Sequence, residues 1–138
     1  MAISSSSVLP IAIAAAAVLI YLPFLAVAVA RAQVGYDISA PRALFDKLPP
    51  YAQRATWAHQ NAFESFTIFV PAALMAYFMG VEGQWVTGAA ISYVVARVLY
   101  PFCYIFDLPW ARSLTFGLGT AASLTLYGLS LLTLKQTL

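Results

Sequence analysis

Residues 8–30 read VLPIAIAAAAVLIYLPFLAVAVA, an apolar stretch that contains no charged side chain. A helix needs about 20 mainly apolar residues to cross the hydrocarbon core of a bilayer. A cleaved secretory signal peptide is the alternative, because small residues lie near the end of the stretch. However, no basic residue precedes it, and it is longer than the apolar core of a signal peptide, which has about 7–15 residues. We therefore expect an uncleaved membrane-spanning helix.

The rest of the chain is almost as apolar. It has 138 residues, of which 62% are hydrophobic and 9% charged, whereas soluble domains carry about 25% charged residues. A chain of this length cannot enclose so much apolar surface in a core, so lipid must cover most of it. The net charge is only +2, and no basic run points to nucleic acid. The single cysteine, Cys103, excludes an intrachain disulfide or a cysteine metal cluster, and no zinc, phosphate-binding or serine-hydrolase motif is present.

The apolar stretches predict an all-α membrane protein, a single domain over residues 1–138 with four membrane-spanning helices. We expect the spans at about 8–30, 54–80, 85–106 and 112–134. Pro101 predicts a kink or break in the third span, since proline cannot donate a backbone hydrogen bond. Basic residues gather in the two loops that follow the first and third spans. By the positive-inside rule, these loops are cytoplasmic and both termini lie on the non-cytoplasmic side.

Two stripes of polar residues interrupt the second and third apolar stretches. Spacings of three, four and seven place the members of each stripe on one helix face. Charged residues at membrane depth are rare and usually face a partner, a cavity or a ligand. The stripes are therefore the candidate functional region. The first consists of Arg54, Asn61 and Glu64, and the second of Tyr93, Arg97, Tyr100 and Tyr104.

The chemistry of the stripes suits a zwitterionic ligand. Arginine binds carboxylates in a bidentate manner, a glutamate can pair with an ammonium group, and tyrosines supply hydroxyl donors on rigid rings. The alternative is that Glu64 simply neutralises Arg97 or Arg54 inside the bundle, as charges within membranes often do. The spacing does not decide between the two. His59 lies about 140° from Arg54 around the helix, and we expect an interfacial polar residue there rather than a metal ligand.

Residues 54–64, RATWAHQNAFE, with Pro71 shortly after them, resemble the second-helix motif of the MAPEG family, the membrane-associated proteins in eicosanoid and glutathione metabolism. Residues 96–104, ARVLYPFCY, and 112–116, RSLTF, are similar to the third helix of that family and the start of its fourth. The resemblance covers essentially the whole chain. It implies a homotrimer of four-helix subunits, in which glutathione binds between neighbouring subunits near the cytoplasmic face.

The resemblance also implies roles for individual residues. Asn61 and Glu64 would hold the backbone of glutathione, and Arg31 would be available to one of its carboxylates. Arg112 matches the arginine that stabilises the glutathione thiolate, and a cation beside a thiol does favour the thiolate, which is the nucleophile. The expected catalytic residues are Arg112 and Tyr104, and the expected glutathione-binding residues are Arg31, Arg54, Asn61, Glu64, Tyr93, Arg97 and Tyr100.

The function expected from this resemblance is that of a glutathione-dependent transferase or peroxidase of the membrane, which acts on lipophilic electrophiles arriving from the bilayer. One residue departs from the pattern. Trp57 stands where glutathione-using members often carry another arginine, so a carboxylate clamp is lost, and Arg54 would replace it only in part. The family also contains a non-catalytic lipid-binding member. The alternative is therefore a non-catalytic protein that binds lipid or a protein partner in an intersubunit groove.

Overall fold

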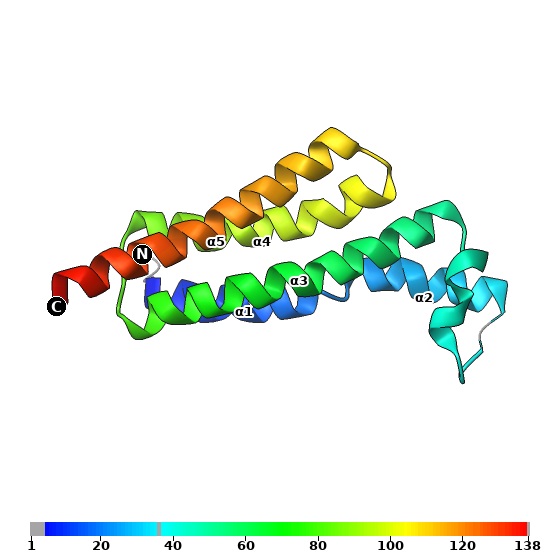
Figure 1. Cartoon of the computed structure of the whole chain (residues 1–138), viewed down its shortest axis with the longest axis horizontal. Coiled ribbons are helices and arrows are strands. Elements are labelled where there is room, and N and C mark those ends of the chain that lie inside the picture. Colours follow the sequence, from blue (N-terminus) through cyan, green and yellow to red (C-terminus); the bar gives the residue numbers. More distant parts are fainter. Residues whose placement is uncertain (1–4, 36, 138) are drawn as a thin grey trace.

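The computed structural model describes residues 5–35 and 37–137, and all the regular structure within them is helical. Along the chain the elements are α1 (Ser5–Leu19), α2 (Leu22–Val34), the 3₁₀ helix η1 (Pro41–Lys47), α3 (Pro50–Phe78), α4 (Gln84–Ile105) and α5 (Pro109–Thr137). Figure 1 shows α1 and α2 following one another along α3, while α4 and α5 run side by side as a second antiparallel pair. The start of α1 and the end of α5 lie at the same end of the molecule as the turn between α3 and α4.

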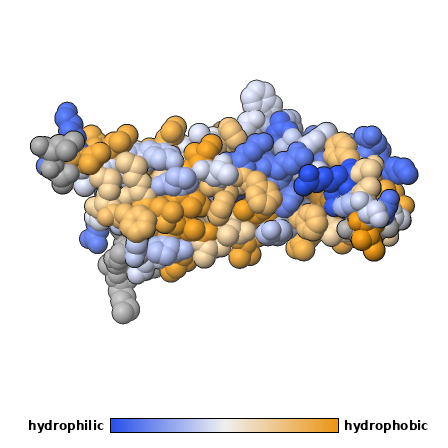
Figure 2. Space-filling view, turned by 60° about the horizontal axis from the view of Figure 1, so that its bottom comes forward, coloured by the Kyte–Doolittle hydropathy of each residue, from blue (hydrophilic) through white to orange (hydrophobic). Residues whose placement is uncertain are grey.

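Within the described residues, three stretches are long and apolar enough to cross a membrane. They are Ser7–Val34, Gln84–Ile105 and Pro109–Gln136. The span expected over residues 54–80 lies in α3, whose first half carries the polar stripe, and α3 is not among the three. Figure 2 shows the same division on one face of the molecule, where hydrophilic residues gather over the half that holds η1 and apolar residues dominate the other half.

Small residues bring the helices together in the core. α3 packs through a row of buried alanines, Ala72, Ala73 and Ala76, against α1, α4 and α5. Residues without bulky side chains let membrane helices approach closely, so that packing contacts rather than burial from water hold them together. The larger side chains that fill this core are Leu9, Phe69, Val86, Tyr93 and Leu126.

Prolines and two left-handed residues set the helix boundaries. Helices α3 and α5 begin at Pro50 and Pro109, about one turn before the expected Arg54 and Arg112, because the first helical position needs no N–H donor. Helices α3 and α4 are followed by Gly80 and Asp107, which have φ of 63° and 58°. The residue after each returns a hydrogen bond to the preceding helix, which satisfies one of its last carbonyls. Of the kink or break expected at Pro101, the break does not occur, because α4 continues through this residue.

The first apolar stretch is not one helix, contrary to expectation, but breaks at Ile20 and Tyr21. Pro23 lies in the first turn of α2 and has no N–H to continue the helical hydrogen bonds. The carbonyl of Ile20 instead contacts Nδ1 of His59 at 2.7 Å. Because a carbonyl can only accept, Nδ1 must carry the proton. His59, expected to be an interfacial polar residue, thus joins α3 to the break between α1 and α2.

Replacing His59 with leucine should therefore destabilise the protein. The carbonyl of Ile20 would lose its donor in a partly buried position, at a cost of about 1–3 kcal/mol. His59→Asn is the matched control, because its amide places an N–H close to the position of Nδ1 and should recover part of the loss. Thermal unfolding of the detergent-purified protein, followed by circular dichroism, measures both. A His59→Leu protein as stable as the wild type would show that the hydrogen bond does not hold the junction.

Candidate functional site

A buried arginine joins the two polar stripes. Arg97 is 5% exposed, and its two terminal nitrogens, Nη1 and Nη2, donate to Oδ1 of Asn61 at 3.3 and 3.2 Å. The guanidinium carbon also lies 4.3 Å from the centre of the Tyr100 ring. A buried cation is costly unless acceptors or an aromatic face compensate for the lost water. The pair therefore connects α4 to α3 and orients the Asn61 amide.

The orientation of the Asn61 amide also determines its hydrogen bond to Glu64. Since the oxygen of its amide faces Arg97, its nitrogen Nδ2 is free to donate to Oε2 of Glu64, which it does at 3.4 Å. Glu64 is exposed. No basic side chain of the described residues forms an ion pair with it. The alternative that Glu64 neutralises Arg97 or Arg54 is thus not realised within one chain, and the carboxylate remains available to a cationic group.

Two adjoining hollows of about 400 and 310 Å³ open beside this network. Both are lined by Asn61, Tyr100 and Tyr104. Five of the expected site residues therefore meet around one continuous region. The first hollow is completed by Trp57, Gln60 and Glu64, and the second by Arg112, Ser113 and Phe116.

The Arg112 edge of this region favours an anion. Arg112 lies in the first turn of α5, and its guanidinium carbon is 4.6 Å from the centre of the Tyr104 ring. The Tyr104 ring in turn meets that of Tyr100 edge to face, with centroids 5.7 Å apart. A helix N-terminus carries a partial positive charge, which adds to the charge of the arginine. The region formed by the two hollows thus has the carboxylate of Glu64 in the first and the positive charge of Arg112 in the second.

Three expected site residues lie elsewhere. Tyr93 is 1% exposed and packs in the core, where its hydroxyl meets Ser65 at 3.0 Å and its ring stacks on Phe69 at 3.6 Å. Arg54 donates through Nε to the carbonyl of Ile105 at 3.1 Å and so satisfies the end of α4. Arg31 lines a different cavity, between α2, η1 and α3.

Trp57 forms a wall of the first hollow. Its ring lies 5.7 Å from that of Phe45 and 6.3 Å from that of Tyr104, so it joins η1 to the end of α4. Sequence reasoning identified Trp57 only as the loss of a cation, and it did not include Gln60, Ser113 or Phe116. The position of Gln60, one helical turn before Glu64, was a usable signal. The positions of Ser113 and Phe116 depend on how α5 packs against α3 and α4.

The helices and this site define an integral membrane protein with a helical bundle and a polar region set among its spans. The model of the MAPEG family matches residues 10–132, and the chain belongs to that family, as the motifs around Asn61 and Arg97 indicated. MAPEG proteins include glutathione transferases and peroxidases as well as non-catalytic members. No curated protein is significantly similar to the chain.

The contacts of Asn61 and Glu64 predict opposite effects of two substitutions. Asn61→Leu removes the acceptor of a buried arginine and should cost about 1–3 kcal/mol of stability. Glu64→Gln keeps the shape of an exposed side chain that has no ionic partner among the described residues, and should change stability by less than about 0.5 kcal/mol. Thermal unfolding in detergent compares the two proteins. Equal destabilisation by both would mean that Glu64 pairs with a cation after all, supplied by a neighbouring subunit.

Proposed function

We propose that the protein is a membrane-bound glutathione-dependent transferase or peroxidase that acts on lipophilic electrophiles. The observation that supports this most strongly is the convergence of Asn61, Glu64 and Arg112 around one region, with a carboxylate at one end and a cation at a helix N-terminus at the other. Glutathione is a zwitterion with an ammonium group, carboxylates and a thiol, and these charges match that arrangement. MAPEG proteins generally use glutathione as a substrate or cofactor.

In this proposal each group of the site has a separate task. Glu64 accepts the ammonium group of glutathione, and Asn61, held in place by Arg97, offers its amide to the peptide backbone. Arg112 stabilises the thiolate, which is the reactive form of the thiol. The thiolate sulfur then attacks the electrophile, a bond from sulfur to the electrophile forms, and the leaving group departs. Tyr104, against the Arg112 guanidinium, supplies a hydroxyl donor beside the sulfur.

Arg112→Ala should reduce turnover far more than glutathione binding, because the arginine acts on charge that develops at sulfur rather than on the anchors of the tripeptide. Loss of a preorganised charge stabiliser typically lowers the rate by about 10²–10³. Conjugation of a generic aromatic electrophile and the ultraviolet absorbance of bound thiolate should fall together. Lys135→Ala, at the far end of the same helix, is the matched control. An Arg112→Ala protein with full turnover would show that another group activates the thiol.

Trp57 favours a second candidate, a non-catalytic protein that binds lipid or a protein partner. Its indole occupies the wall where a cation would clamp a carboxylate, and Arg54, whose Nε donates to the end of α4, lines neither hollow. The same measurements separate the two candidates. A wild-type protein that shows neither a thiolate absorbance nor conjugation would favour the second candidate, whether or not glutathione binds.

We further propose that α3 is a fourth membrane span, that both termini are non-cytoplasmic and that three subunits assemble. The long α3 lies alongside α1 and α2, the start of α1 and the end of α5 are at the same end of the molecule (Figure 1), and the family resemblance implies a trimer. Native mass spectrometry measures the number of subunits. Thiol labelling of a cysteine introduced at Glu82, in a Cys103→Ser background, measures the orientation. A stable monomer, or labelling of residue 82 from the cytoplasmic side alone, would contradict the proposal.

A further inference from the structure

The two hollows around Asn61 carry charges of both signs, but only one cation among the described residues lines them. Glu64 lines the first hollow and Arg112 the second. Arg97 is buried and donates its two terminal nitrogens to Asn61, and Arg54 lines neither hollow. When Arg112 faces a thiolate, as in the proposed function, the lining offers no second cation to a carboxylate.

Trp57 and Glu64 line the first hollow at different heights along α3. They are seven residues apart in the sequence, which places them on the same face of the helix and about 10 Å apart along its axis. An extended tripeptide covers about the same distance, 10 Å. A peptide thiol with its ammonium group at Glu64 would therefore bring its opposite end against Trp57.

The wall at Trp57 is aromatic and uncharged. Its indole is 42% exposed, and its ring centre lies 5.7 Å from that of Phe45 and 6.3 Å from that of Tyr104. Gln60 adds a neutral amide to the same lining. A carboxylate against these rings would lose water without gaining a cation, which is costly, and the face of an aromatic ring is itself negative. An ester or an amide would lose less water and could still accept a hydrogen bond from Gln60.

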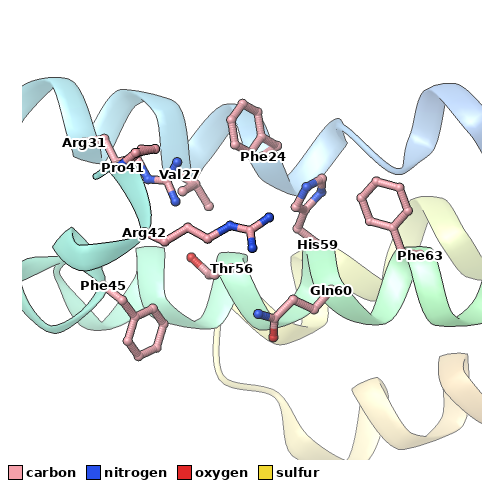
Figure 3. A pocket seen from close by; sticks show the side chains of 10 residues that line it. All are labelled: Phe24, Val27, Arg31, Pro41, Arg42, Phe45, Thr56, His59, Gln60 and Phe63. Atoms are coloured by element: carbon pink, nitrogen blue, oxygen red, sulfur yellow. The ribbon is translucent and has the colours of Figure 1, made fainter. Parts of the chain in front are cut away.

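Two further arginines lie in a neighbouring cavity. Figure 3 shows Arg42 extending from η1 into the space between α2 and α3, with Arg31 on α2. Phe45 lines that cavity and Trp57 lines the first hollow, so the contact between their rings lies between the two spaces. The indole thus separates the far end of a bound thiol from these arginines.

We propose that this site selects a thiol with an ammonium group at one end and an uncharged group, an ester or an amide, at the end that meets Trp57. Trp57 is the residue that determines this specificity. The inference rests on the proposed function of the same region, in which Glu64 accepts the ammonium group and Arg112 faces the sulfur. It narrows the substrate class to amino thiols without a carboxylate at the far end, so glutathione itself binds no more tightly than its ester.

The test is isothermal titration calorimetry of the full-length protein in neutral detergent, with glutathione and with its monoethyl ester, in which the glycyl carboxylate is esterified. We expect the wild type to bind the ester at least as tightly as glutathione. Trp57→Arg should shift the ratio of the two affinities about tenfold toward glutathione, the effect of one hydrogen bond to a charged group. Trp57→Phe is the matched control, because it keeps an aromatic wall and should keep the wild-type ratio.

The outcomes separate this inference from the proposed function. Tighter binding of glutathione than of the ester by the wild type would overturn the inference without any variant, and conjugation of an aromatic electrophile to glutathione would then leave the proposed function standing. An unchanged ratio in Trp57→Arg, or the same shift in Trp57→Phe, would also overturn the inference. Binding in the expected order without conjugation of either thiol would support the inference and contradict the proposed function. Thermal unfolding checks that both variants are folded.

Discussion

The hydrogen bonds from Arg97 to Asn61 are the constraint on which the candidate site depends. They place a cation in a nearly dry position between α3 and α4 and compensate for it with one amide oxygen and one aromatic ring. Because the amide must turn its oxygen toward Arg97, its nitrogen must face Glu64. One buried contact thus orients the two residues that a ligand would meet, although Arg97 itself is hardly accessible. Preorganisation of this kind reduces the ordering cost of binding.

Much of the fold follows from the sequence because apolar length and helical period are local properties. The described residues are mostly helical, as expected, although the first expected helix is divided into α1 and α2. In the second stripe, Tyr100 and Tyr104 line the hollows, and Arg97 contacts Asn61 beside them. The break at Ile20 was not foreseen. Apart from Pro23, this uncharged stretch contains no local signal of a break. The residue that stabilises the break, His59, lies on another helix. Positions whose role depends on a partner far along the chain are those at which sequence reasoning is weakest.

The same explanation covers the site residues that lie elsewhere. Tyr93 belongs to the same stripe as Tyr100, yet it lies in the core, where its hydroxyl bonds to Ser65 and its ring stacks on Phe69. Arg54 shares a helix face with Asn61, yet the end of α4 lies within its reach and offers an unpaired carbonyl. The helical period of the sequence predicts which face of a helix a side chain occupies. It does not predict whether that face meets a cavity, a neighbouring ring or a helix end, because this depends on packing between helices.

Trp57 shows how one substitution could change the use of this scaffold. An arginine at this position would bring a second cation to the region that Arg112 lines and would favour ligands with several carboxylates. The indole brings an apolar face and closes the gap between Phe45 and Tyr104, which makes the wall stiffer and less polar. Across Gln60, the cavity between α2, η1 and α3 is lined by Arg31 and Arg42, whereas the first hollow has no arginine in its lining and the second has Arg112. The carboxylate of Glu64 and the guanidinium of Arg112 thus belong to one region, which suits a ligand with charges of both signs, whereas the cavity across Gln60 has arginines and no carboxylate in its lining.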